Sequence, residues 1–257
     1  MVTCNILILG GTADARQLAE QLAGMPGLSA TVSLAGRTVR PRQLPGRVRI
    51  GGFGGAEGLA RYLVEHRIDI LVDATHPFAA RISTNAVAAA ERAGVPLVTV
   101  ARPQWERVAG DRWLDARDVA HAASLLGSEP ATVFLAIGRQ EVAPFTAYAQ
   151  HRYIVRSVDP VPADELPSDA TVILDRGPFD MDAEKRLFET HGVDVVVSKN
   201  SGGPATYGKI AAARALQLPV VMIARPPHIS LGEPAVDVEA AMLRIRHLAG
   251  LPIERGE

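Results

Sequence analysis

The sequence is poor in cysteine and lysine, with one cysteine and only three lysines among its 27 basic residues. A lone Cys4 can form neither an internal disulfide nor a zinc cluster, which favours a reducing compartment. The formal net charge is −1 and no basic block occurs, so the chain lacks the positive surface that nucleic acids require. No apolar run approaches the roughly 18 residues of a membrane span, and no signal peptide is recognisable. We therefore expect a cytoplasmic protein with neither a nucleic acid nor a membrane as partner.

Motifs of several catalytic classes are also missing. The chain has neither the G-x-S-x-G turn of serine hydrolases nor the H-E-x-x-H helix of zinc proteases, and its seven histidines are scattered. These absences argue against hydrolases and metalloenzymes. We expect no metal, and we favour chemistry carried by an organic cofactor.

What the chain does contain is an alternation of Val/Ile/Leu-rich runs with alanine-rich segments of helical length. This pattern is typical of parallel βα units and predicts an α/β fold with mainly parallel sheets. Strands are expected near 4–9, 30–34, 47–50, 69–73, 96–100, 131–136, 152–156, 170–174, 193–198 and 219–223. Helices are expected near 13–24, 56–66, 78–93, 117–126, 139–149, 181–191, 204–216 and 235–248.

The segment 101–113 interrupts this alternation with Pro103, Gly110 and both tryptophans. Because proline, glycine and charged residues mark connecting segments, we predict a domain boundary here. The predicted domains are 1–103 and 104–257.

The stretch "ILILGGTADAR" places Gly10, Gly11, Thr12 and Ala13 between a strand and an amphipathic helix. Free N–H groups and the helix dipole make such a turn a good pyrophosphate site, although only part of the G-x-G-x-x-G pattern is present. The alternative is a plain βα turn in which glycine permits the tight bend.

The end of the second predicted strand, "VSLAGRTVRPR", has no acidic residue to grip a ribose 2′-hydroxyl. It offers Ser33, Gly36 and Arg37 instead, and a hydroxyl with a guanidinium suits a 2′-phosphate. NADP is therefore favoured over NAD. The alternative is an arginine-rich surface loop.

The stretch "VDATHPFAA" ends the fourth predicted strand with Asp73, Thr75 and His76. Ligands of doubly wound folds bind at this edge of the sheet, and a histidine can transfer protons near neutral pH. His76 is the candidate for a direct chemical role, with Asp73 orienting the loop. The alternative is that Thr75 caps the next helix and His76 is a packed side chain.

A second glycine-rich loop, "VVVSKNSGGP", follows a strand of the second domain. Lys199 offers a mobile charge, Asn200 and Ser201 offer hydrogen bonds, and Gly202 and Gly203 allow backbone amides to approach an anion. The spacing is not that of a P-loop, so a carboxylate is a suitable ligand. The alternative is a helix-capping loop with an exposed lysine.

Four stretches together resemble the precorrin-6A reductase family of cobalamin biosynthesis: "LGGTADARQLAEQL", "VDATHPFAARISTNA", "RPQWERVAGDRW" and "VSKNSGGPATYGKIAAARALQLPVVMIARP". The resemblance implies two Rossmann-like domains with an active-site cleft between them. It also implies reduction of one double bond of the precorrin-6A macrocycle, a tetrapyrrole, to give precorrin-6B with hydride from NADPH.

On this resemblance, 1–103 is the NADPH-binding domain and 104–257 binds the substrate. The turn Gly10–Ala13 with Ser33, Gly36 and Arg37 holds NADPH, the loop with Asp73, Thr75 and His76 lies near the nicotinamide, and Lys199–Gly203 faces the carboxylates of the macrocycle. Three alternatives stay open: a reductase of the cobalt-containing analogue that uses NADH, a non-catalytic nucleotide-binding protein, and another two-domain α/β enzyme such as a nucleotide-sugar transferase.

Overall fold

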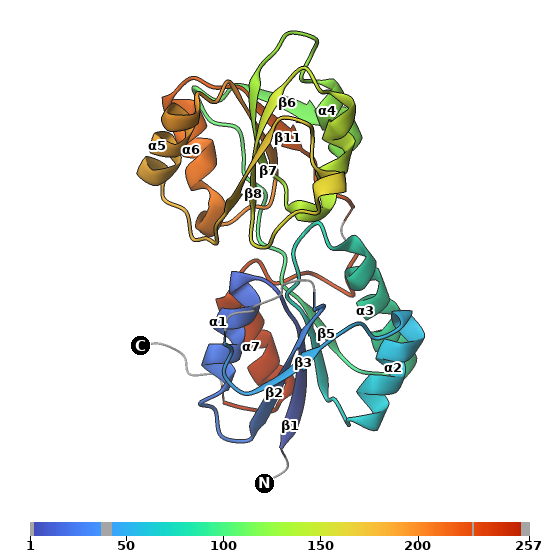
Figure 1. Ribbon diagram of the computed structural model, residues 1–257. Helices are drawn as coiled ribbons and strands as arrows, with labels where there is room; N and C mark the ends of the chain where they lie inside the picture. The colour runs from blue at the N-terminus through green and yellow to red at the C-terminus, as the bar shows by residue number, and fades with distance from the viewer. Residues whose placement is uncertain (1–2, 37–42, 228, 253–257) are drawn as a thin grey trace. The chain divides into compact units, whose positions relative to one another are not determined.

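The computed structural model describes residues 3–36, 43–227 and 229–252, which form two α/β units (Figure 1). The first unit comprises the residues up to Pro103 together with those from Pro226 onward, and the second comprises Gln104–Arg225. Each unit contains one sheet in which all the recorded strand pairs are parallel. The prediction of an α/β protein with mainly parallel sheets is confirmed.

The first unit has a five-stranded sheet of order β3-β2-β1-β4-β5. Its strands are β1 (Cys4–Leu9), β2 (Leu28–Leu34), β3 (Arg47–Ile50), β4 (Ile70–Asp73) and β5 (Leu97–Thr99). Its helices are α1 (Ala13–Leu22), α2 (Gly55–Glu65), α3 (Ala80–Ala93) and α7 (Val238–Leu248).

Helices cover both faces of this sheet, which explains why β1 is apolar without interruption (Figure 1). Successive side chains of a strand point to opposite faces. Ile6 and Ile8 accordingly pack with α1 and α7, whereas Leu7 and Leu9 pack with α2 and α3. The buried strand ends are thereby fixed, and the loops that follow them are presented at one edge of the sheet.

The C-terminal segment departs from the predicted boundary, because residues from Pro226 onward belong to the first unit rather than the second. Helix α7 packs against α1 and β5, and Ala235 forms a parallel bridge with Val100. Its apolar stripe of Val238, Met242 and Ile245 completes the core beside α1. The second domain predicted as 104–257 is therefore corrected to a unit that ends at Arg225, since the face that buries α7 lies on the first sheet.

The second unit has a six-stranded sheet of order β6-β11-β10-β7-β8-β9. Its strands are β6 (Trp113–Ala116), β7 (Thr132–Ala136), β8 (Arg152–Ser157), β9 (Ala170–Leu174), β10 (Val195–Lys199) and β11 (Val220–Ile223). Its helices are α4 (Val119–Ser124), α5 (Met181–His191) and α6 (Gly208–Ala215).

Two local predictions for the second unit were wrong. The edge strand β6 was not expected, because only four residues form it and they follow a polar segment. The helix expected near 139–149 is a pair of short 3₁₀ turns, η1 (Arg139–Glu141) and η2 (Ala143–Ala147). Pro144 has no N–H to donate within a longer α-helix, so the segment stays in short turns.

In residues 3–36, 43–227 and 229–252, no helix combines the length and the apolar character that a membrane crossing requires.

Candidate functional site

The strand order of the first unit reverses direction between β1 and β4, and the loops that follow these two strands meet there. The hydroxyl of Thr12 donates a hydrogen bond to the carbonyl of Ala74 at 2.7 Å. The same oxygen accepts the N–H of Ala15 at 3.1 Å and so caps α1. The predicted glycine turn and the loop after β4 are therefore joined at the switch point where doubly wound sheets bind ligands.

Gly10 and Gly11 fill different requirements of this turn. A Cβ at Gly10 would lie 2.8 Å from the Cγ1 of Val32, so only glycine lets β1 and α1 pack this closely against β2. Gly11 has φ +111°, and a Cβ there would meet nothing within 4 Å. The turn is thus held in a glycine-only conformation beside open space. Because Thr12 uses its hydroxyl within the protein, the backbone N–H groups at Ala13 and its neighbours are the donors this turn offers.

An arginine that the sequence reasoning missed stands at the start of α1. Arg102 pairs with Asp14 at 2.7 Å between Nη1 and Oδ2, and both side chains are partly exposed. Asp14 alone would repel an anion at the first turn of the helix, and the guanidinium balances that charge. The sequence gives little indication of this role, because Arg102 precedes a proline in the segment predicted to be a linker.

A second missed arginine stands at the end of β2. Ser33 is buried there, and Nη1 of Arg49 lies 3.3 Å from its hydroxyl oxygen. Arg49 also donates to the carbonyls of Gly51 and Gly52, and its guanidinium stacks 3.7 Å from the ring centre of Phe53. Within the described residues, the guanidinium beside Ser33 therefore comes from β3, the edge strand next to β2.

Gly36 and Arg37 were also predicted to bind the cofactor at the end of β2. Arg37 lies outside the described residues. Gly36 ends the described part of the loop with φ +74°, a conformation that favours glycine.

The loop after β4 is organised by Asp73, which is buried. Its Oδ1 accepts the N–H and the hydroxyl of Thr75 at 3.1 and 2.7 Å, and Ser83 lies 3.4 Å from the same hydroxyl. Asp73 thus orients the loop, as expected. Thr75 does not cap α3, which begins at Ala80 instead of near residue 78.

His76 lies half-buried in this loop. The N–H of Phe78 donates to its Nδ1 at 3.2 Å. In the neutral ring an accepting Nδ1 leaves the proton on Nε2. The arrangement therefore gives the neutral ring of His76 a defined tautomer, with its proton on Nε2.

In the second unit, the loop Lys199–Gly203 starts at the last residue of β10, at the corresponding edge of the sheet. Lys199 is neither mobile nor exposed, because its side chain is 12% exposed and its Nζ pairs with Oε2 of Glu141 at 2.8 Å. Glu141 stands in η1, just beyond the neighbouring strand β7. A charge pair, rather than a lone cation, occupies this edge.

Trp105 holds the middle of the loop. Its N–H donates to Oδ1 of Asn200 at 2.8 Å, and Nδ2 of Asn200 donates back to its carbonyl at 3.0 Å. The indole Nε1 donates to the carbonyl of Gly203 at 2.8 Å. The amide of Asn200 is consequently bonded inside the protein through both its oxygen and its nitrogen.

Arg225, two residues after the end of β11, bonds to the same loop. Its Nε and Nη2 donate to the carbonyls of Asn200 and Ser201 at 2.7 and 2.8 Å. Gly202 and Gly203 have φ +66° and +73°, and within the described residues neither donates its N–H to a protein acceptor. With its carbonyls held by Trp105 and Arg225, the loop presents these two N–H groups as donors for an anion.

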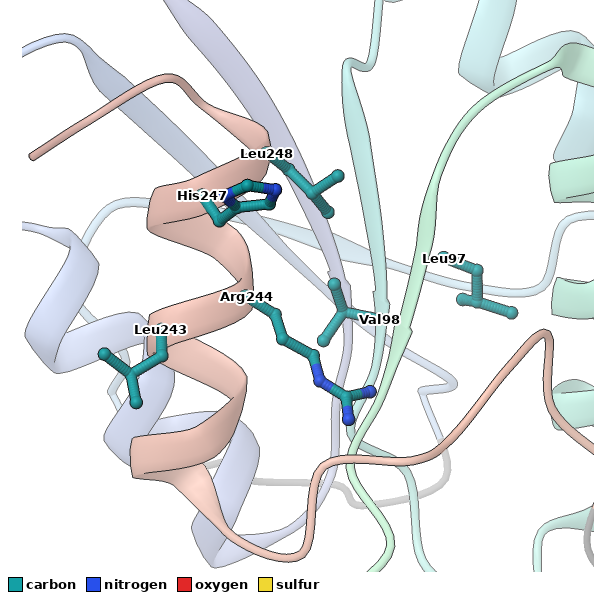
Figure 2. Close-up of a pocket in the computed structure, with 6 residues that line it drawn as sticks. All are labelled: Leu97, Val98, Leu243, Arg244, His247 and Leu248. Carbon is teal, nitrogen blue, oxygen red and sulfur yellow. The ribbon is translucent and has the colours of Figure 1, made fainter. Parts of the chain in front are cut away.

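A pocket of about 320 Å³ lies elsewhere in the first unit, between α7 and the start of β5 (Figure 2). It is lined by Leu97, Val98, Leu243, Arg244, His247 and Leu248. Leu97 begins β5, whereas the glycine turn and His76 follow the carboxyl ends of their strands. The pocket is therefore separate from the candidate site of this unit.

Comparison with known proteins gives concordant matches over nearly the whole chain. The family model for precorrin-6x reductase CbiJ/CobK matches residues 5–246. A precorrin-6A reductase from Sinorhizobium sp is 54% identical over 222 residues, which cover 86% of this chain and 85% of that protein. A precorrin-6A reductase from Rhodococcus erythropolis is 49% identical over 238 residues, covering 93% of this chain and 96% of that protein.

A solved structure gives the same result for the fold. CobK precorrin-6A reductase matches with a TM-score of 0.92 at 41% identity, over 97% of this chain and 99% of that chain.

Proposed function

The chain belongs to the precorrin-6x reductase CbiJ/CobK family, and from this premise we propose that it reduces precorrin-6A with hydride taken from NADPH. It is an oxidoreductase of cobalamin biosynthesis. The reaction adds a hydride and a proton across one double bond of the macrocycle and yields precorrin-6B.

The contact between Ser33 and Arg49 is the observation that supports NADPH rather than NADH as the cofactor. A hydroxyl and a guanidinium lie 3.3 Å apart at the end of β2, where dinucleotide folds contact the adenosine ribose. In the described residues that end β2, 33–36, no Asp or Glu is present to bind a 2′-hydroxyl. This combination supports recognition of a 2′-phosphate.

The glycine turn fits the pyrophosphate of the same cofactor. Gly11 leaves open space at the start of α1, and the first-turn N–H groups together with the helix dipole favour an anion there. Arg102 adds positive charge and offsets Asp14. When bound, NADPH supplies the hydride, and the protein supplies its orientation.

His76 is the proposed proton donor. Its loop is joined to the glycine turn through the bond from Thr12 to Ala74, and Asp73 and Thr75 fix the loop internally. To act as the acid, His76 would have to be in its imidazolium form, which gives one proton to the reduced macrocycle and leaves a neutral ring to be reprotonated from solvent. The bond from the N–H of Phe78 to Nδ1 favours the neutral ring that remains after this donation.

The loop Lys199–Gly203 is the proposed grip on a substrate carboxylate. The N–H groups of Gly202 and Gly203, two successive glycines with positive φ, are the proposed donors to it. Lys199 supplies positive charge beside them, although Glu141 competes for it.

Purified protein mixed with authentic precorrin-6A and NADPH tests the proposal directly. We expect oxidation of NADPH together with formation of precorrin-6B, and a lower KM for NADPH than for NADH. No oxidation with authentic precorrin-6A would contradict the proposed reaction. Turnover of cobalt-precorrin-6A with NADH in preference would instead assign the chain to the cobalt-containing substrate.

A further inference from the structure

Three charged side chains are buried together in the core of the second unit. They are Arg156 on β8, Glu184 on α5 and Lys209 on α6, with 6%, 2% and 4% of their surface exposed. Nη1 of Arg156 forms an ion pair with Oε1 of Glu184. Lys209 therefore adds a second cation to a pair that is already balanced.

The surplus charge on Lys209 is costly, because a buried cation that no anion balances is poorly solvated. Burial, followed by repulsion from Arg156, lowers the pKa of Lys209 to about 7, and attraction by Glu184 opposes this shift. The other charged residue of α6, Arg214, is paired with Asp111. Lys209 thus changes its charge near neutral pH under the influence of Arg156 and Glu184.

Lys209 contacts Trp105, which holds the loop Lys199–Gly203, and Thr206 in the turn that follows this loop. Its Nζ donates to the carbonyl of Thr206 at 2.7 Å, in the 3₁₀ turn η4 (Pro204–Thr206) that follows the loop at once. The same Nζ lies 4.7 Å from the ring centre of Trp105, within the range of a cation–π interaction. Trp105 in turn holds Asn200 and Gly203. Both contacts are stronger when the amine carries its proton.

We propose that Lys209 is a positioning residue for substrate binding, which holds the loop Lys199–Gly203 in its carboxylate-binding conformation through Trp105 and Thr206. The inference rests on the proposed function, because it takes the ligand of that loop to be a carboxylate of precorrin-6A. The charged form of Lys209 holds the loop more firmly than the neutral form.

The test compares the wild type with Lys209→Met and with Lys185→Met. Methionine fills a similar volume without charge and leaves the pair of Arg156 and Glu184 balanced, so the fold is expected to persist. Lys185 is a matched control, because it lies on α5 of the same unit and forms only an exposed pair with Glu189. For each protein, the KM for precorrin-6A, kcat and the Kd for NADPH are measured from about pH 6 to about pH 9.

For the wild type and the Lys185→Met control, we expect the KM for precorrin-6A to rise through the region around pH 7 while the Kd for NADPH stays constant. Lys209→Met should have a KM raised about tenfold at the acid end and no such rise with pH. A wild-type KM that is flat with pH, or the same pH dependence in Lys209→Met, would overturn the inference. Either of these results is obtained with an enzyme that turns over precorrin-6A, so it contradicts only the role of Lys209. A wild type that does not turn over precorrin-6A would contradict the proposed function itself.

Discussion

Trp105 and Asn200 exchange two hydrogen bonds, at 2.8 and 3.0 Å, across 95 residues of sequence. The backbone N–H of Trp105 donates to the side-chain amide of Asn200, and the backbone carbonyl of Trp105 accepts from the same amide. Because an amide is the side-chain group that both donates and accepts in this fixed geometry, the pair orients the loop that starts at Lys199.

Asn200→Asp is expected to destabilise the second unit. The carboxylate can still accept the N–H of Trp105, but its other oxygen would face the carbonyl of Trp105 in a buried setting. Loss of a buried donor and burial of a charge should lower the free energy of unfolding by about 2 kcal/mol, measured by urea denaturation. Asn85→Asp on the half-buried side of α3 serves as the control and should change stability far less. Equal stability of Asn200→Asp and the wild type would show that the pair contributes nothing.

Arg49→Met is expected to weaken NADPH binding selectively. Loss of a charged contact to the 2′-phosphate should raise the KM for NADPH about tenfold or more and leave the KM for NADH nearly unchanged. Arg47→Met, two residues earlier on β3 and exposed, is the matched control. If both cofactors lost affinity equally, Arg49 would be supporting the loop through Gly51 and Gly52 rather than recognising the phosphate.

Lys199→Ala is expected to raise the KM for precorrin-6A by about tenfold, because a charge-assisted contact to a carboxylate is lost. The Kd for NADPH should stay the same, since the proposed cofactor residues all belong to the other unit. Calorimetry with NADPH and steady-state kinetics with precorrin-6A measure the two effects. Lys185→Ala controls for the loss of a lysine, and the reverse selectivity would show that the ligands are assigned to the wrong units.

Lys209→Met is expected to stabilise the protein, and most strongly at low pH. The pKa of Lys209 is about 7 in the folded state, against an ordinary value of 10.5. Between these values the unfolded chain binds more protons than the folded one, so this lysine makes the free energy of unfolding rise with pH. Its destabilising effect is therefore complete below the folded pKa and fades as the pH approaches 10.5.

The gain from Lys209→Met should be about 1 to 3 kcal/mol near pH 6 and should shrink steadily at alkaline pH. Urea denaturation of both proteins at several pH values measures this difference. A constant difference, or a loss of stability at about pH 6, would show that the lysine is not a buried surplus charge.

Much of the fold and of the glycine turns could be predicted from the sequence, because their signals are local. The apolar run of β1, buried on both faces, leads into Gly10 and Gly11, and Thr12 provides the cap that starts α1. Such features depend on neighbours a few residues apart. The family resemblance rests on the same short stretches.

Only the tertiary structure decided which side chains share those loops. Arg102 reaches Asp14 across 88 residues, Trp105 reaches Asn200 across 95, and α7 returns to the first sheet. Arg49 reaches Ser33 from β3, and Lys209 is buried although a helical lysine is most often exposed. These arrangements follow from strand order and from the packing of distant segments, because partner choice and burial are properties of the assembled core and not of any short stretch of chain.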